Sequence, residues 1–355
     1  MALRGSATTY PSRSWATIQP HDADLDEAKL KRTKTWLDDN VSDPRFRRYK
    51  ERHPGEGYRL VIVRRGRIAA EWNSGIDRSA LLNIWSATKS VYSCILGILI
   101  DDGVISSADA KINDYYPEAF DVPEGFGPKP GRFVTEKDLN ITFRQLICNT
   151  SGYMKPNEQP GQVFHYQTYG MNILVHALET ACGLYDSRSP ESSATLRARV
   201  DDHITHPIGA AWDYYTYNFD LQPSARLNVF GNFLGITSSA LDMARLGWLW
   251  RNHGAWNGQQ LIPKGWMEEA TRTAPDIEAN CPEDDWRYGH GFWTNDHRKL
   301  WPSLPQDSFA ASGAGQNHIW VSPSLDLVVV QSPGLYEDQH ESDNQVLLRI
   351  ADACM

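Results

Sequence analysis

Cysteine is scarce in this sequence and shows no pairing pattern. The 355 residues contain five cysteines, an odd number, and no two of them form a C-x-x-C motif. Secreted disulfide scaffolds and structural zinc sites both require paired spacings. We therefore exclude both, and we expect Cys94 and Cys148, which lie in apolar runs, to be buried as small hydrophobic residues.

Long hydrophobic runs and an excess of basic charge are also missing. The first twenty residues hold no apolar run of the length of a signal-peptide core. The longest later run, residues 94–100, is too short to span a bilayer. The net charge of −9 opposes binding to nucleic acid or to an anionic membrane. We expect a cytoplasmic protein with neither partner; the oligomeric state stays open.

Several widespread catalytic motifs are absent too. The sequence contains no G-x-S-x-G nucleophile elbow, no H-E-x-x-H zinc motif, no Walker A loop and no G-x-G-x-x-G fingerprint. These absences exclude the commonest signatures of serine and zinc hydrolases and of nucleotide-binding proteins. We expect no metal and no organic cofactor.

The hydrophobic periodicity of the chain predicts both helices and strands. Helical spacing occurs in residues 24–40, 86–102, 142–148, 171–181, 237–250, 261–271 and 343–354. Strand-like runs occur in residues 58–63, 68–72, 288–295, 316–321 and 325–331. The first two strands are predicted to form a hairpin, and residues 185–194 an exposed loop.

This order of elements predicts an α+β fold. Strands near both ends of the chain favour one antiparallel β-sheet flanked by helices, with a mainly helical lobe inserted. We divide the chain into an N-terminal arm (1–22), a sheet domain (23–103 with 231–355) and a mainly helical domain (104–230). The active site is expected where the two lobes meet.

One local pattern carries nucleophile chemistry. Ser86 and Lys89 form the single S-x-x-K of the chain, directly before an apolar helical run. Residues three apart share a helix face, so the amine can reach the hydroxyl, and the helix N-terminus favours developing negative charge. Average residue frequencies produce such a pattern about once in a chain of this length. An ordinary lysine at a capped helix start is therefore the alternative.

Four segments together resemble one known superfamily. Residues 85–90 (WSATKS) resemble the nucleophile motif of the serine β-lactamases and penicillin-binding proteins. Residues 141–152 are similar to its I-T-x-x-x-L-L-x-H-T-S-G segment, 160–166 to P-G-x-x-F-x-Y, and 255–258 to a G-x-W-N-G turn. These segments follow one another in the same order as in the superfamily, and the resemblance covers residues 20–350. The pattern is most similar to class C β-lactamases, family VIII carboxylesterases and 6-aminohexanoate-dimer hydrolase.

The resemblance implies roles for individual residues. Ser86 would be the nucleophile, Lys89 its base, and Tyr166 the proton carrier of the second motif, with Tyr153 and Tyr169 as nearby competitors. The third motif corresponds to residues 311–316. It implies an oxyanion hole made by the backbone N–H groups of Ser86 and Ala314.

Two departures from the family pattern bear on the substrate. The second motif has Thr168 in place of asparagine, and the third has Ala311 in place of lysine. In β-lactam-handling relatives these residues bind the side-chain amide and the carboxylate of the substrate. Their loss favours neutral esters or amides over penicillins. Further candidates for contact with the substrate, with core packing as the alternative for the tryptophans, are Trp85, Thr168, Ser312, Gly313, Trp293 and Trp320.

We therefore expect a serine hydrolase that cleaves a small-molecule carboxylic ester or amide through an acyl-enzyme on Ser86. The alternatives are an amidase of the 6-aminohexanoate-oligomer type, an acyltransferase, a β-lactamase and a non-catalytic binding protein. A literal Ser-Asp-Asn at residues 342–344 is interpreted as a helix cap. Residues 201–206 (DDHITH) are interpreted as a solvated loop, and His165 and His318 as structural residues.

Overall fold

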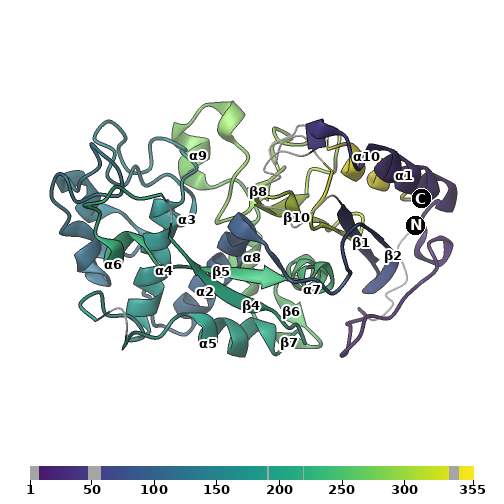
Figure 1. The fold of residues 1–355 in the computed structure, drawn as a ribbon, viewed down its shortest axis with the longest axis horizontal. Coiled ribbons are helices and arrows are strands. Elements are labelled where there is room, and N and C mark those ends of the chain that lie inside the picture. Colours follow the sequence, from purple (N-terminus) through teal and green to yellow (C-terminus); the bar gives the residue numbers. More distant parts are fainter. Residues whose placement is uncertain (1–7, 47–56, 190–191, 219, 336–343) are drawn as a thin grey trace.

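The computed structural model describes residues 8–46, 57–189, 192–218, 220–335 and 344–355. Its central feature is a six-stranded antiparallel sheet with strand order β2-β1-β11-β10-β9-β8, assembled from both ends of the chain (Figure 1). The predicted α+β class is confirmed. The strands are β1 (Tyr58–Arg64), β2 (Arg67–Ser74), β8 (Trp293–Thr294), β9 (Phe309–Gly313), β10 (Asn317–Ser322) and β11 (Leu327–Gln331).

Helices cover the sheet on both faces. Alternate residues of a strand point to opposite faces of the sheet, so Tyr58 and Arg64 of β1 share one face. On that face Tyr58 donates a hydrogen bond to Asp38 of α1 (Glu27–Asn40), and Arg64 donates one to the carbonyl of Asp24, just before α1. At the start of α1, Asp26 donates its N–H to Ala353, so α10 (Gln345–Asp352) lies beside it. On the opposite face α7 (Ala240–Arg251) packs across β1, β10 and β11.

A close contact fixes α7 on the sheet. A Cβ atom on Gly247 would lie 2.4 Å from Val328 Cγ1 and 2.9 Å from Ile319 Cγ2. Such distances are shorter than van der Waals contact, so only glycine lets the helix backbone approach β10 and β11 this closely.

A second sheet, which the sequence analysis did not predict, lies beside the first. Its strand order is β3-β5-β4, with β3 (Leu82–Asn83), β4 (Asp213–Tyr217) and β5 (Phe233–Ser238). The predicted helix at 237–250 is therefore wrong at its start. The helix begins after Ser239, whose side chain accepts a hydrogen bond from the N–H of Asp242.

Residues 104–230 contain the helices α3 (Phe143–Ile147), α4 (Tyr169–Ala181), α5 (Arg197–Val200) and α6 (Leu227–Phe230). This segment also contains β4. The loop at 185–194 is not uniformly exposed: Tyr185 is buried and its ring stacks on His176 at 4.3 Å. The predicted strand 288–295 is also too long. Gly289 and Gly291 turn the chain there, and only Trp293–Thr294 pairs with β9.

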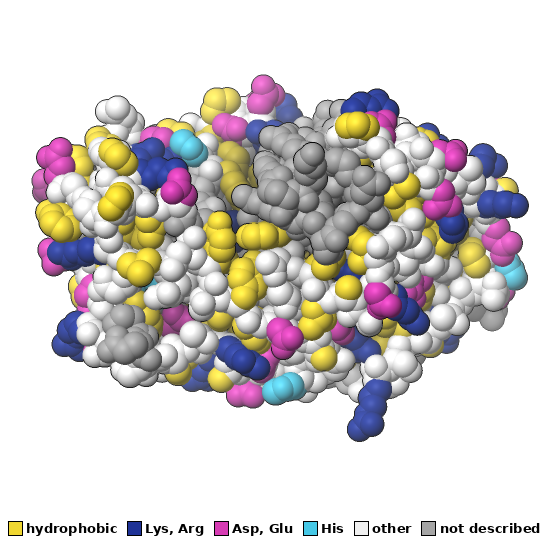
Figure 2. All heavy atoms as spheres, in the orientation of Figure 1, with side chains coloured by type: hydrophobic (Ala, Val, Ile, Leu, Met, Phe, Trp, Pro, Cys, Tyr) yellow, Lys and Arg dark blue, Asp and Glu magenta, His cyan; other side chains and the backbone are white. Residues whose placement is uncertain are grey.

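Five further elements are the two-residue strands β6 (Ala255–Trp256) and β7 (Gln259–Gln260) and the helices α2 (Thr88–Asp101), α8 (Lys264–Ala270) and α9 (Pro275–Asn280). Within the described part of the chain, none of the helices has the length and apolar character needed to cross a membrane. On the face in Figure 2, basic and acidic side chains are interspersed, and no single basic field stands out.

The contact at Gly247 predicts opposite outcomes for one substitution at two helical glycines. Gly247→Ala should lower the free energy of unfolding by about 1–3 kcal/mol, because the new methyl group overpacks against Val328. Gly265→Ala in α8, where a Cβ would meet nothing within 4 Å, should leave it unchanged or raise it slightly. Urea unfolding followed by circular dichroism measures both values. Equal stabilities of the two variants would contradict this packing.

Two buried histidines predict a loss of stability in acid. Burial lowers the pKa of His290 to about 4 and that of His318 to about 3. Below pH 6.5, the ordinary pKa of histidine, these residues become protonated in the unfolded chain but stay neutral in the folded protein. The free energy of unfolding therefore falls as the pH drops from 6.5. Each histidine should cost on the order of 2 kcal/mol by pH 5. His318→Gln should flatten urea-measured stability over this range, and an unchanged pH slope would contradict the assignment.

Candidate active site

Ser86 lies in a tight turn rather than in a regular helix. Residues Trp85–Ala87 form one turn of 3-10 helix, and the α-helix α2 begins only at Thr88, two residues later than predicted. Trp85 has a positive φ of 49°, an uncommon conformation for a bulky side chain and one that concentrates at functional sites. Because α2 is buried along most of its length, it fixes this turn in the core.

Lys89 faces Ser86 across one turn. Its Nζ atom donates a hydrogen bond to Ser86 Oγ at 2.7 Å, and the lysine side chain is only 1% exposed. An amine held so close to a hydroxyl can take its proton once the amine is neutral. The spacing that drew attention in the sequence thus corresponds to direct contact.

Tyr166, in the loop before α4, lies close to Lys89. Lys89 Nζ lies 4.9 Å from the centre of its ring, within the range of a cation–π contact. The ring stacks on Trp293 at 5.3 Å and meets Tyr288 edge-to-face at 5.7 Å. Asn149 orients the neighbouring backbone, since its carbonyl accepts from the N–H of His165 and its side chain accepts from that of Gln167.

The competing tyrosines are engaged elsewhere. Tyr153 donates its hydroxyl to the carbonyl of Ala119, and burial raises its pKa well above the ordinary value. Tyr169 donates to the carbonyl of Asp220 at 3.1 Å. Tyr166, by contrast, has its ring within cation–π distance of Lys89.

Strand β9 lies directly against the Ser86 turn. A Cβ on Gly313 would stand 1.9 Å from the carbonyl oxygen of Ile84 and 3.1 Å from the nitrogen of Ala87. The next residue, Ala314, begins the tight turn between β9 and β10 and lines the same pocket as Ser86.

Asn317, which the sequence analysis did not single out, ties this region together. Its Nδ2 atom donates to the carbonyls of Ala314 and Asn83, and its Oδ1 atom accepts from the hydroxyl of Ser332. The available signal was only a polar residue at the head of a strand with an apolar centre, residues 319–321. The side chain of Asn317 holds the backbone of the β9–β10 turn beside the chain that leads to Ser86.

A small pocket of about 180 Å³ opens at Ser86. Three of its lining side chains, Tyr215, Tyr217 and Phe233, were not among the sequence candidates because they come from β4 and β5 of the unpredicted sheet. The remaining lining residues are Trp85, Ser86, Lys89, Thr168 and Ala314.

Several other candidates lie away from the pocket lining. Trp320 has no exposed surface and belongs to the sheet core, Trp293 is buried behind Tyr166, and Ser312 is buried in β9. His165 forms an ion pair with Glu158 and is exposed. His318 is buried in β10.

The structure also bears on the interpretations of residues 201–206 and 342–344. Residues Asp201–Thr205 form a π-helical turn rather than the expected loop, and Tyr214 donates its hydroxyl to Asp201. In the Ser-Asp-Asn segment, residues 342–343 lie outside the described residues. Asn344 does cap α10, since its side chain accepts from the N–H groups of Val346 and Leu347.

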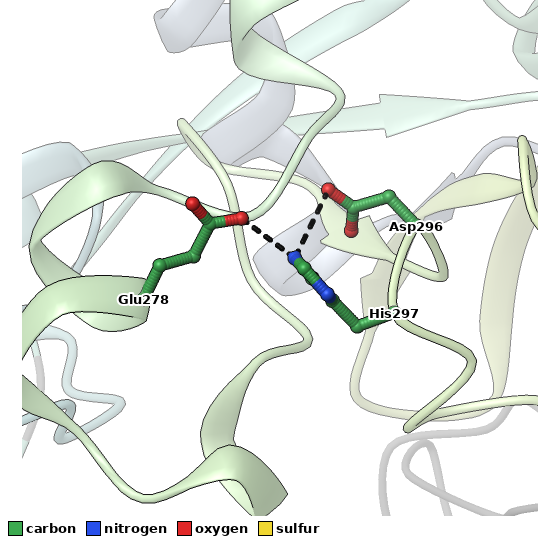
Figure 3. A group of neighbouring side chains, drawn as sticks. All are labelled: Glu278, Asp296 and His297. Atoms are coloured by element: carbon green, nitrogen blue, oxygen red, sulfur yellow. Dashed lines mark hydrogen bonds and ion pairs between the residues drawn. The ribbon is translucent and has the colours of Figure 1, made fainter.

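One group of side chains in the described residues has the donor set of a metal site. In Figure 3, His297 points toward Glu278 and Asp296, with its Nε2 atom 2.6 Å from Glu278 Oε1 and 3.9 Å from Asp296 Oδ2. Glu278 is exposed, and none of the three lines the pocket at Ser86. The contacts are those of a surface ion pair.

Solved structures of similar fold have diverse activities. A family VIII carboxylesterase matches with a TM-score of 0.60 at 16% identity, covering 92% of this chain and 98% of its own. EstCE1, a hydrolase with promiscuous acyltransferase activity, matches with a TM-score of 0.62 at 14% identity over 92% and 98%. A Bacillus anthracis protein named as a 6-aminohexanoate-dimer hydrolase matches with a TM-score of 0.59 at 17% identity over 90% and 79%.

No curated protein matches the sequence. The family model described as Beta-lactamase matches residues 43–347, a span that includes the Ser86 turn, Tyr166 and the β9–β10 turn. By this match, which covers most of its length, the chain belongs to the beta-lactamase family.

Proposed function

We propose that this protein is a serine hydrolase that cleaves an uncharged carboxylic ester or amide through an acyl-enzyme on Ser86. The observation that carries the proposal is the 2.7 Å hydrogen bond from Lys89 Nζ to Ser86 Oγ, two residues that line the same pocket. A buried lysine bonded to a serine hydroxyl matches the general pattern of a nucleophile activated by an adjacent base.

In the first step Ser86 Oγ attacks the carbonyl carbon of the substrate. Its proton passes to the amine of Lys89, which acts as the base, and the carbonyl oxygen becomes an oxyanion. The backbone N–H groups of Ser86 and Ala314 would stabilise that charge, because both residues border the same pocket. The contact at Gly313 favours this role by keeping β9 beside the Ser86 turn.

In the second step the tetrahedral intermediate collapses and the bond to the leaving group breaks. Tyr166, next to Lys89, donates its hydroxyl proton to the departing alcohol or amine and is reprotonated from Lys89. Water then attacks the acyl-enzyme by the reverse route, and the free acid leaves. An alcohol or amine in place of water would give acyl transfer.

The pocket favours neutral substrates. Among the described residues that line it, Lys89 is the one basic side chain, and its amine is bonded to Ser86. The position of the family's carboxylate-binding lysine is held by Ala311, which is buried in β9. A substrate carboxylate would have no cationic side chain of its own there.

Named activities of the structural neighbours support this range of reactions. They include a carboxylesterase, a hydrolase with promiscuous acyltransferase activity and a protein named as a 6-aminohexanoate-dimer hydrolase. Ester hydrolysis is the primary proposal, and acyl transfer on the same site is the second. Hydrolysis with and without an added alcohol acceptor distinguishes the two through the products formed.

Removal of the nucleophile should abolish hydrolysis. Ser86→Ala should lower kcat/KM for p-nitrophenyl acetate at least about 1,000-fold, because no acyl-enzyme can form. Ser93→Ala is the matched control: it lies in the same helix, and its buried hydroxyl has no hydrogen-bond partner in the described structure. Release of p-nitrophenolate measures both, with circular dichroism to establish folding. Full activity of a folded Ser86→Ala protein would refute the proposal.

β-Lactam hydrolysis should be poor. With Ala311 and Thr168 in place of the family's lysine and asparagine, kcat/KM for nitrocefin should be at least about 100-fold below that for p-nitrophenyl acetate. The colour change of nitrocefin provides the measurement. Comparable or faster turnover of nitrocefin would mean that this protein is a β-lactamase in activity as well as in family.

A further inference from the structure

One side of the Ser86 pocket is a wall of aromatic rings. Tyr215 and Tyr217 are two residues apart on β4 and therefore point to the same face. Their register partners on β5 are Gly235 and Phe233. Phe233 lines the pocket together with both tyrosines.

Gly235 determines how this wall is built. A Cβ on Gly235 would lie 2.2 Å from Cζ and 2.5 Å from Cε1 of Tyr215. The outer part of the Tyr215 ring therefore occupies the space that any other side chain at position 235 would take. Glycine at this position lets the ring pack against β5 where it lines the pocket.

Trp85 closes the wall next to the nucleophile. Its ring meets Tyr215 at 6.1 Å with an interplanar angle of 74°, and Tyr217 at 5.7 Å with an angle of 88°. These are the edge-to-face geometries that aromatic side chains prefer. The three rings thus support one another, so the wall is formed before a substrate enters.

The position of the leaving group determines which part of the substrate contacts these aromatic rings. In the proposed reaction Tyr166 protonates the leaving group, which must therefore lie beside that hydroxyl. Tyr166 packs against Trp293 and Tyr288 and is not among the residues that line the pocket. The pocket consequently lies on the acyl side of the carbonyl carbon.

The volume of the pocket and the charges of its lining side chains restrict which acyl groups can bind. The pocket volume of about 180 Å³ is close to that of an engineered cavity of about 150 Å³ that binds benzene. No acidic side chain is among the described lining residues, and the one amine is bonded to Ser86. A single uncharged ring fits this space and this chemistry, whereas a long alkyl chain exceeds it.

Building on the proposed function, we propose that the natural substrate carries a compact, uncharged, ring-bearing acyl group, which binds between Trp85, Tyr217 and Phe233. Aromatic walls favour an aromatic ring, because stacked or edge-to-face contacts add to the gain from burying its apolar surface. The wall formed by β4 and β5 is thus the specificity-determining element of the enzyme.

Three p-nitrophenyl esters with one leaving group test this proposal on the full chain. After correction for spontaneous hydrolysis, kcat/KM for the phenylacetate should exceed that for the acetate at least about 10-fold and that for the decanoate at least about 100-fold. A phenylacetate-to-acetate ratio of one or below, or a preference for the decanoate, would overturn the proposal.

Two variants test the wall itself. Tyr217→Ala removes one ring and should lower the phenylacetate-to-acetate ratio at least about fivefold while raising the relative turnover of the decanoate. Gly235→Ala displaces the Tyr215 ring and should lower the same ratio without improving the decanoate. Thr216→Ala, on the opposite face of β4, is the control and should leave all three values unchanged. An unchanged ratio in Tyr217→Ala would refute the assignment.

These results separate the two proposals. If the wild-type protein hydrolyses none of the esters, the proposed function itself fails. If it hydrolyses the acetate through Ser86 but shows no preference for the phenylacetate, the hydrolase stands and the ring-bearing acyl group is wrong.

Discussion

The close approach of strand β9 to the Ser86 turn is the contact on which the site depends. At Gly313 the strand lies so near the carbonyl of Ile84 and the nitrogen of Ala87 that a single methyl group would not fit. This contact joins the sheet, whose strands come from both ends of the chain, to the buried helix that carries Lys89. It also brings Ala314 to the border of the pocket that Ser86 lines. Asn317 supports the arrangement by bonding to the carbonyls on both sides of the gap, those of Ala314 and Asn83.

In the proposed reaction, different parts of the chain contribute different groups. The Ser86 turn and α2 supply the proposed nucleophile and its amine, and residues 104–230 supply Tyr166 and Thr168. Lys89 lies between Ser86 and Tyr166. Its Nζ atom donates a hydrogen bond to Ser86 Oγ and lies over the ring of Tyr166. The aromatic side chains behind Tyr166 and those around Trp85 are separate groups. The first packs against Tyr166, the proposed proton carrier, and the second lines the pocket, so the two can be altered independently.

The sequence predicted what depends on short spacings and regular periods. Ser86 and Lys89 are three residues apart, and the central strands β1, β10 and β11 each contain an apolar run of three or four residues, so local patterns were sufficient. The small sheet was missed because its strands are two to six residues long and pair residues 82–83 and 213–217 with 233–238, far apart in the chain. The start of β5 and the end of β4 offer no local signal that they are neighbours. Tyr215, Tyr217 and Phe233 were overlooked for that reason, and Gly235 acquires its meaning only once the ring of Tyr215 is seen above it.

The central claim is that Ser86 is a nucleophile activated by its contact with Lys89. Labelling with a fluorophosphonate, followed by mass spectrometry of the intact protein and of its peptides, tests this claim most directly, because the reagent needs no knowledge of the substrate. The account predicts one adduct per chain, located on Ser86, absent in Ser86→Ala and formed at least about 100-fold more slowly in Lys89→Met. A folded protein that remains unlabelled, or one that carries the adduct on another residue, would contradict it.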